Sequence, residues 1–353
     1  MQASQSSGGT HFSRHAHPGH PQRTRPHSHP HHGSNHQRPQ QRSHARPHQR
    51  PHQRPQASPV HAWDQQFFAG SVVDPAPRIR LEKGSSEWTM RAMDIICPIG
   101  RGQRGLIVAP PGSGKTTFLK HLCESVSKGY PEIKLYCLLV DERPEEVTDF
   151  RRSVKAEVRS SSSDESYSHH IEVANNLMKD VFKEVAGGAH VMVLIDSLTR
   201  LSRVHNAEGR SSGRTLSGGV DARAMEIPRR IFGSARNIEN GGSLAILASI
   251  LVDTGSRMDQ IIFEEFKGTG NMEMVLSREV SNQRIFPALD IAKSGTRKDH
   301  LLFDPEEYMS AVRIRRALAG LGTLEAAAAF TRQLEKYPTN AEFLKAIGQV
   351  SVT

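Results

Sequence analysis

Apolar residues are distributed unevenly along the 353-residue chain. From Met1 to about Gln56 they are nearly absent and proline recurs every few residues, so we predict that this stretch is disordered. From about Val72 onwards the pattern is that of a globular protein. Continuous apolar runs, which are typical of strands covered on both faces, occur at Leu106–Ala109, Leu135–Val140, His190–Ile195 and Leu244–Leu251.

Helical patterns separate these runs. They cover about Thr116–Ser127, Glu145–Val158, His170–Val185 and Asp221–Asn237, and two more follow at Pro305–Leu318 and Leu324–Tyr337. Strands that alternate with helices predict an α/β fold with a mostly parallel sheet between helices. We expect three parts: a disordered His/Arg/Gln/Pro-rich tail (1–60), a short segment that leads into the folded part (61–100), and an α/β domain with a helical C-terminus (101–353).

The net charge of +9 arises almost entirely in the tail. Residues 1–60 contain eight Arg, no Lys and no acidic residue. Removing these eight from the chain's 46 Lys and Arg leaves 38 against 37 Asp and Glu, so the folded part is nearly neutral. A basic arm of this kind is typical of proteins that bind nucleic acid or another anionic surface. The alternative is a solubilising tail without a fixed partner, and we favour nucleic acid.

Three cysteines, Cys97, Cys123 and Cys137, lie in apolar surroundings and form no CxxC pair. Their odd number does not suggest disulfides, so we expect them to pack in the core of a protein from a reducing cytoplasm. No apolar run approaches the ~20 residues of a membrane span, and the N-terminus has no apolar segment that could act as a signal peptide. We therefore expect a cytoplasmic protein without membrane contact.

The most specific local motif follows the first apolar run and reads Ala109-Pro110-Pro111-Gly112-Ser113-Gly114-Lys115-Thr116-Thr117. Glycines permit a loop whose backbone N–H groups wrap phosphates, and the helix that follows adds partial positive charge. The expected nucleotide-binding residues are Pro111, Gly112, Ser113, Gly114, Lys115, Thr116 and Thr117. Lys115 is expected on the β- and γ-phosphates of ATP, and the Thr116 hydroxyl on Mg²⁺. The strict pattern has Gly in place of Ala109.

Two later strand ends carry carboxylates. Asp196 follows Val191–Ile195 and is expected to hold Mg²⁺, because ligands collect at the carboxyl ends of parallel strands; helix capping is the alternative. Asp141 and Glu142 follow Leu138–Val140, and one of them is the natural candidate for the group that activates the attacking water. The pattern alone does not choose between these two, and a capping role stays open.

Longer motifs follow in order between about Val73 and about Glu342. They are Val140-Asp141-Glu142-Arg143-Pro144-Glu145-Glu146-Val147-Thr148, Asp196-Ser197-Leu198-Thr199-Arg200, Gly218-Gly219-Val220-Asp221, Asp253-Thr254-Gly255-Ser256-Arg257-Met258-Asp259, Glu264-Glu265-Phe266-Lys267-Gly268-Thr269-Gly270-Asn271, Arg284-Ile285-Phe286-Pro287-Ala288 and Ser294-Gly295-Thr296-Arg297-Lys298. Together they resemble the motor domain of the bacterial transcription termination factor Rho family.

The resemblance implies a RecA-like P-loop ATPase that uses ATP and Mg²⁺ and works as a homohexamer. It implies that Glu142 is the catalytic carboxylate and that Phe286 stacks on the adenine ring. Arg297 would be an arginine finger on the γ-phosphate of the neighbouring subunit's nucleotide, and Arg284 a second cation at that interface. Without the resemblance, a surface ion pair would be the simpler interpretation of each arginine.

The resemblance also implies two loops that hold RNA in a central channel. The first spans about 210–219 and offers Ser212, Gly213, Arg214 and Thr215; the second runs from Asp253 to Arg257, with Lys267 assisting. Small, polar and basic residues suit contacts with the backbone of single-stranded RNA. The implied function is an ATP-dependent RNA translocase or helicase that binds nascent RNA, releases it from RNA polymerase and so terminates transcription.

The chain departs from the family in two places. Rho proteins carry an N-terminal OB domain of about 70 residues, whereas only Pro59–Arg80 precede the motor outside the tail. We expect that domain to be absent, replaced or supplied by another chain, with the tail as an unspecific electrostatic RNA grip. In addition, Gly112 stands where the family tends to have a basic residue.

Two alternatives compete with this interpretation. One is another RecA-type hexameric ATPase, such as a rotary ATPase subunit, which the RNA loops and the block from Phe286 to Arg297 disfavour. The other is an RNA-binding protein with an idle ATPase. The intact Lys115, Glu142, Asp196 and Arg297 argue against an idle ATPase.

Overall fold

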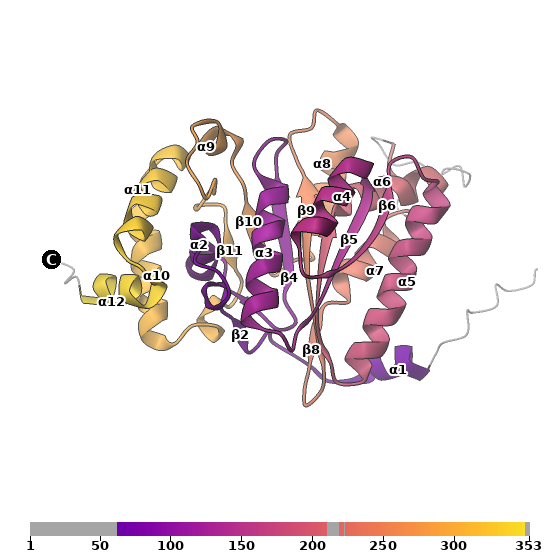
Figure 1. Cartoon of the computed structure of the whole chain (residues 1–353), viewed down its shortest axis with the longest axis horizontal. Helices are drawn as coiled ribbons and strands as arrows, with labels where there is room; N and C mark the ends of the chain where they lie inside the picture. Colours follow the sequence, from indigo (N-terminus) through magenta and orange to yellow (C-terminus); the bar gives the residue numbers. More distant parts are fainter. Residues whose placement is uncertain (1–61, 210–218, 222, 350–353) are drawn as a thin grey trace, which may run out of the picture. The chain divides into compact units, whose positions relative to one another are not determined.

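The computed structural model describes residues 62–209, 219–221 and 223–349. All of them belong to one compact unit, Ala57–Thr353. The tail (1–60) and most of the first predicted RNA loop, including Ser212, Gly213, Arg214 and Thr215, lie outside the described residues. Within the compact unit, helices lie on both faces of a central sheet (Figure 1).

Six parallel strands of the described chain form the centre of this sheet, in the order β10-β4-β9-β7-β5-β6. β11 pairs antiparallel with β10 at one edge, while β8 pairs antiparallel with β9, and β1 with β8. A separate antiparallel pair joins β2 and β3. The bounds are β1 Val72–Val73, β2 Arg78–Ile79, β3 Ile99–Gly100, β4 Arg104–Ala109, β5 Lys134–Glu142, β6 Glu157–Ser162, β7 His190–Asp196, β8 Arg236–Ile238, β9 Ser243–Leu251, β10 Met272–Val275 and β11 Gly295–Thr296.

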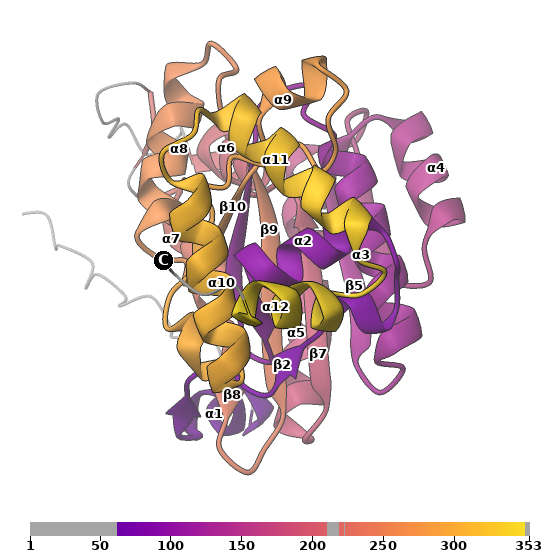
Figure 2. The ribbon, with the colours of Figure 1, turned by 90° about the vertical axis from the view of Figure 1, so that its left-hand side faces the viewer.

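A hydrophobic cluster lies on each face of the sheet, because successive strand side chains point to opposite faces. In β4, Ile107 belongs to one cluster, and Leu106 and Val108 belong to the other. α2, α3, α4, α10, α11 and α12 cover the first face, and α1, α5, α6, α7 and α8 the second. In Figure 2, α2, α10, α11 and α12 lie together in front of the strands.

The helix bounds are α1 Ala62–Ala69, α2 Trp88–Ile96, α3 Lys115–Gly129, α4 Pro144–Ser153, α5 Tyr167–Ala186, α6 Leu198–Gly209, α7 Glu226–Gly233, α8 Arg257–Lys267, α9 Arg278–Asn282, α10 Pro305–Leu318, α11 Thr323–Lys336 and α12 Asn340–Gln349. Short 3₁₀ turns occur at Leu81–Lys83 and Asp299–Leu301. The predicted α/β class with a mostly parallel sheet between helices is confirmed.

Two predicted helices are shorter than expected, and their last residues are strands. The helix predicted at Glu145–Val158 ends at Ser153, and β6 begins at Glu157. The helix predicted at Asp221–Asn237 is limited to α7, and β8 begins at Arg236. In both places, hydrogen bonding to a neighbouring strand, β5 or β9, outweighs the local helical pattern.

The cysteines lie in the core, as predicted. Cys97, Cys123 and Cys137 are buried and form no disulfide. The Sγ atoms of Cys123 on α3 and Cys137 on β5 are 3.5 Å apart. Among the described helices, none combines the length and the hydropathy that a membrane span requires.

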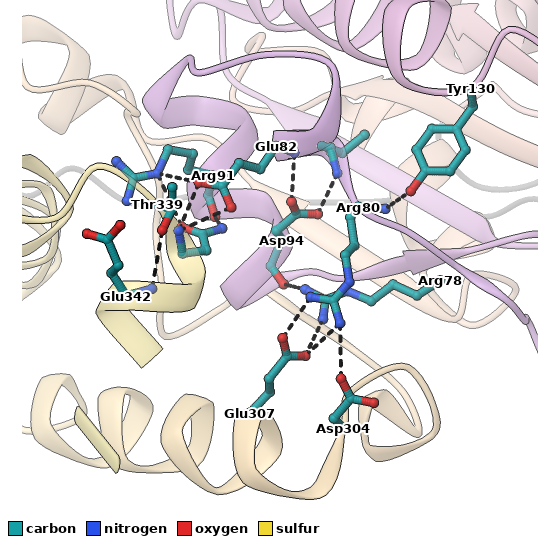
Figure 3. Close-up of polar contacts among 12 residues, drawn as sticks. Arg78, Arg80, Glu82, Arg91, Asp94, Tyr130, Asp304, Glu307, Thr339 and Glu342 are labelled. Atoms are coloured by element: carbon teal, nitrogen blue, oxygen red, sulfur yellow. Dashed lines mark hydrogen bonds and ion pairs between the residues drawn. The ribbon is translucent and has the colours of Figure 1, made fainter. Parts of the chain in front are cut away.

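Charged side chains fix the lead segment (61–100) to the C-terminal helices (Figure 3). Arg78 Nη1 donates to Glu307 Oε2 at 3.0 Å, and Arg80 Nη1 donates to Glu307 Oε1 at 2.7 Å. Asp94 on α2 accepts two backbone N–H hydrogen bonds, at 2.9 and 2.8 Å. Burial raises the pKa of Asp94 to about 6, although the charge of Arg78 and these hydrogen bonds oppose the rise. The lead segment is therefore an integral part of the folded unit.

Candidate active site

The loop between β4 and α3 has the geometry of a phosphate cradle. Gly112 and Gly114 have φ angles of 78° and 89°, in the left-handed region that favours glycine. A Cβ atom at either position would meet nothing within 4 Å, so the loop opens onto free space. Ser113 is buried and donates to the carbonyl oxygen of Pro110 at 2.7 Å. Its side chain therefore closes the loop.

Three charged side chains meet beside this loop. Lys115 begins α3, Asp196 ends β7 and Glu142 ends β5. Lys115 Nζ lies 2.5 Å from Asp196 Oδ2 and 3.5 Å from Glu142 Oε1. Both carboxylates are buried, with 3% and 4% exposure. The parallel strands bring these predicted residues together because their carboxyl ends meet at one edge of the sheet.

The local geometry distinguishes Glu142 from Asp141. The pairing of β5 with β6 shifts between Val140 and Glu142, and Asp141 at this irregularity has a φ angle of 58°. The Glu142 carboxylate contacts Lys115, whereas Asp141 contributes its backbone oxygen, which accepts a hydrogen bond from Arg200. This arrangement supports the role that the resemblance implies for Glu142.

Two further side chains belong to the site, and the sequence analysis did not single them out. Arg200 Nη2 lies 3.3 Å from Glu142 Oε2, and Ser249 Oγ donates to Asp196 Oδ1 at 2.7 Å. Both had a signal in the sequence. Arg200 lies four residues after Asp196, and Ser249 is the polar residue that interrupts the apolar run of β9.

The electrostatics of the site raise the pKa of Glu142 well above that of an ordinary glutamate. Burial, followed by repulsion from Asp196, raises the pKa of Glu142 to about 7, although the charges of Lys115 and Arg200 oppose the rise. A carboxyl group with a pKa near neutrality is well matched to accepting a proton from water at physiological pH. The ionised fraction of Glu142 therefore increases as the pH rises through about 7.

This pKa leads to a prediction about pH. If ionised Glu142 accepts the proton, kcat/KM for ATP hydrolysis should increase as the pH rises through about 7 and should level off above it. Arg200→Ala should move this rise to higher pH, because it removes a cation that lowers the pKa of Glu142. Steady-state hydrolysis measured across this pH range checks the shift. Arg151→Ala, which changes an exposed arginine on α4, is the control. An unchanged profile for Arg200→Ala would contradict the assignment of Glu142.

The residues present fit a magnesium nucleotide. Thr116 is half-buried at the second residue of α3, next to the Lys115–Asp196 pair. No group of three or more His, Cys, Asp or Glu side chains in the described ranges is placed to hold a metal by itself. Mg²⁺ typically takes one or two protein oxygens together with phosphates and water. Thr116 and Asp196 are therefore the side chains that would hold it.

The residue predicted to stack on adenine and the two arginines predicted at the subunit interface do not lie together. Phe286 and Arg284 lie at the end of the sheet that carries the phosphate loop, and Arg297 lies at the other end. Phe286 is 45% exposed and follows α9, where Ser281 Oγ donates to the carbonyl oxygen of Gly112 in the phosphate loop. Arg284 is exposed on the same segment. Arg297 is also exposed, but it follows β11, and its N–H donates at 2.8 Å to the carbonyl oxygen of Asn271, just before β10. The structure therefore does not bring Arg297 to Lys115 of the same chain.

The second predicted RNA loop is held by a buried carboxylate. Arg257 is exposed at the start of α8, and Lys267 ends the same helix. Asp259 is 1% exposed and accepts hydrogen bonds from Arg203 Nε at 2.7 Å and Thr254 Oγ1 at 2.6 Å. Arg203 lies on α6, which follows the strand that carries Asp196. A single helix thus joins the site to the loop of Arg257.

Comparisons with known proteins identify a nucleotide-binding domain in this chain. The model of the ATP synthase alpha/beta family, nucleotide-binding domain, matches residues 89–296. Transcription termination factor Rho of Cereibacter sphaeroides is 49% identical over 272 residues, which are 76% of this chain and 64% of that protein. Rho of Haemophilus influenzae is 47% identical over 271 residues (76% and 64%), and Rho of Mycobacterium bovis is 48% identical over 277 residues (78% and 46%). The chain thus spans less than two thirds of the length of these relatives.

A solved structure with the same fold is a prototypical ATPase from the type III secretion system of pathogenic bacteria. It has a TM-score of 0.63 and 23% sequence identity, and the match covers 79% of this chain and 81% of that one. This likeness shows the RecA-like fold. The chain therefore belongs to the ATP synthase alpha/beta family through its nucleotide-binding domain, and this domain is a motor domain of the Rho type.

Proposed function

We propose that this protein is an RNA-stimulated ATPase that moves along single-stranded RNA and terminates transcription by releasing nascent RNA from RNA polymerase. The observation that carries the proposal is the cluster of Lys115, Asp196 and Glu142, joined through α6 to the loop of Arg257. The similarity to proteins named transcription termination factor Rho supports the RNA substrate. We further propose a cytoplasmic homohexamer, with the tail (1–60) as an unspecific RNA grip.

The side chains of the site have separate tasks in hydrolysis. Lys115 holds the β- and γ-phosphates, and the glycines of the loop let backbone N–H groups approach them. Glu142, once ionised, accepts a proton from the attacking water. Arg200 holds the Glu142 carboxylate in place, and Ser249 does the same for Asp196. Bound Mg²⁺ would supply charge neutralisation at the phosphates, held by Thr116 and Asp196.

Phe286 and Arg284 complete the site on the side of α9. The exposed Phe286 ring is available to stack on adenine, which a flat apolar side chain favours. Arg284 adds positive charge at the same edge. We propose that Pro111, Gly112, Ser113, Gly114 and Thr117, which lie in or next to the phosphate loop, also take part in nucleotide binding.

RNA is proposed to contact the loops that continue from this site. Arg257 and Lys267 provide charge for RNA phosphates, and Ser212, Gly213, Arg214 and Thr215 complete the proposed contact surface. α6 carries both Arg200, which contacts Glu142, and Arg203, which contacts Asp259 near the start of α8. We propose that a movement at Glu142 reaches α8 through this helix. This link gives a physical route for coupling hydrolysis to RNA movement.

Arg257→Ala tests the function most directly. Wild-type protein should hydrolyse ATP faster when single-stranded RNA is added, and Arg257→Ala should lose most of this stimulation because it removes a phosphate contact. Hydrolysis rates with and without an oligoribonucleotide are the measurement. Arg332→Ala, which removes an exposed arginine from α11, is the matched control and should be stimulated as the wild type is. Hydrolysis that does not respond to RNA would refute the proposal.

A further inference from the structure

A basic cavity lies at the end of the sheet opposite the phosphate loop. It has a volume of about 490 Å³, and its lining includes Arg104, Arg236 and Lys298. Asp74 is the one carboxylate among its lining residues, and both of its oxygens are taken by Lys298 Nζ at 2.9 and 3.0 Å. The two arginines therefore lack a partner carboxylate within this lining.

The two arginines are held in place by neutral groups. Arg104 Nε and Nη1 donate to the carbonyl oxygens of Thr269 and Ala235 at 3.0 and 3.1 Å, and Arg236 Nε donates to that of Ser234 at 2.9 Å. Burial lowers the pKa of both side chains, and the charge of a neighbouring arginine lowers each further. No ion pair within the described part of the chain offsets either charge. Such a pair of half-buried cations favours an anionic ligand.

An exposed aromatic ring extends this basic surface. The guanidinium of Arg236 lies 4.4 Å from the ring centroid of Phe68 and 4.6 Å from that of Phe67. Phe67 is buried, whereas Phe68 is 43% exposed. An exposed ring beside a guanidinium and further cations is the combination that binds single-stranded nucleic acid, since bases stack on aromatic and guanidinium planes and phosphates pair with cations.

This surface is separate from the phosphate loop of the same chain. Arg104 begins β4 and the phosphate loop follows its end, so the two lie one strand length apart, about 20 Å at ~3.3 Å per residue. In Figure 1, α1 and β8 lie at the opposite end of the sheet from α8 and α9. β8 pairs with β9 and α1 packs against α5, so Phe68 and Arg236 lie on the part of this surface away from the edge strand β11. Lys298 directly follows Arg297, and the charge of Arg297 lowers the pKa of Arg104, so the other part of the surface adjoins Arg297.

We infer that this amino-end surface (Phe68, Arg104, Arg236 and Lys298) binds single-stranded RNA. Arg104 and Lys298 contact phosphates, and a base stacks on Phe68 and Arg236. The inference rests on the proposed function, and it adds an RNA contact outside the channel loops. Such a contact would hold a transcript on the face of the motor that adjoins the lead segment, while the loops at the other end pull it.

Two substitutions with matched controls test the surface. Phe68→Ala should weaken the binding of a fluorescently labelled, single-stranded oligoribonucleotide about tenfold, as expected for the loss of one stacked base. Trp88→Ala is the control, because Trp88 is similarly exposed (41%) but lies on α2. Lys298→Ala should reduce the magnitude of the negative slope of log affinity against log salt by about 0.7, the value for one phosphate contact. Lys128→Ala, which removes another exposed and paired lysine, should leave the slope unchanged.

The outcomes separate this inference from the proposed function. If the wild type binds RNA and Arg257→Ala loses stimulation, but Phe68→Ala and Lys298→Ala bind RNA like their controls, the amino-end surface is refuted and the function stands. If the wild type neither binds RNA nor responds to it, both fail. Ultraviolet cross-linking followed by peptide mass spectrometry gives an independent readout, in which an RNA adduct on the peptide with Phe68 supports the surface.

Discussion

Arg297→Ala should lower the rate of ATP hydrolysis about 10³- to 10⁵-fold, the range for removal of an arginine finger. The guanidinium of such a finger stabilises charge on the transferring phosphoryl group. Nucleotide binding should change much less, because Lys115 and the phosphate loop remain. Comparing single-turnover hydrolysis with the affinity for a fluorescent ATP analogue separates the two effects.

The fold leads us to expect that this effect arises between chains. Arg297 lies at the amino-terminal ends of β10 and β4, whereas Glu142 lies at the carboxyl end of β5. The distance along a strand such as β4, about 20 Å, exceeds the length of an arginine side chain. We therefore expect Arg297 to serve the nucleotide of a neighbouring protomer.

Mixing two inactive variants tests this geometry. In a ring assembled from Arg297→Ala and Glu142→Gln protomers, some interfaces combine an intact Arg297 from one protomer with an intact Glu142 from the next. Partial recovery of hydrolysis in the mixture is expected, and each variant alone is the control. A mixture as inactive as its components would contradict a site shared between protomers.

Glu142→Gln should lower hydrolysis about 10²- to 10⁴-fold, the range for loss of a general base. The amide keeps the size of the side chain but does not accept the proton of the attacking water at neutral pH. Nucleotide affinity should stay near the wild-type value, because the phosphate loop is unchanged. The measurement is hydrolysis at saturating ATP, with binding of the nucleotide analogue followed in parallel.

Asp141→Asn is the matched control for this substitution. The neighbouring carboxylate has the same chemistry, but Asp141 contacts the site through its backbone oxygen, which the substitution retains. We expect less than a tenfold loss of activity for Asp141→Asn. A larger loss than that of Glu142→Gln would reverse the assignment of the two carboxylates.

Local patterns determined much of the fold. The long apolar strands β4, β5, β7 and β9 and the helices α3, α5, α10 and α11 lie close to where the sequence predicts them. These elements carry their own periodicity, so short-range information suffices to find them. The phosphate loop is equally local, because its glycines and Lys115 are consecutive in the chain.

Only the tertiary structure decided the features that depend on distant neighbours. β6 and β8 exist because β5 and β9 provide hydrogen-bonding partners, which no local pattern records. Packing at the strand ends brought Arg200 to Glu142 and Ser249 to Asp196.

The sequence by itself determined which chemistry this protein carries: a phosphate loop, a set of carboxylates and the basic residues to accompany them. The tertiary structure decided which carboxylate faces Lys115, that Arg297 lies beyond reach of its own site, and that Phe68 and Arg236 meet at the amino-terminal end of the sheet. The physical reason is that residue type is a local property, whereas distance, burial and charge pairing arise only when remote segments pack together.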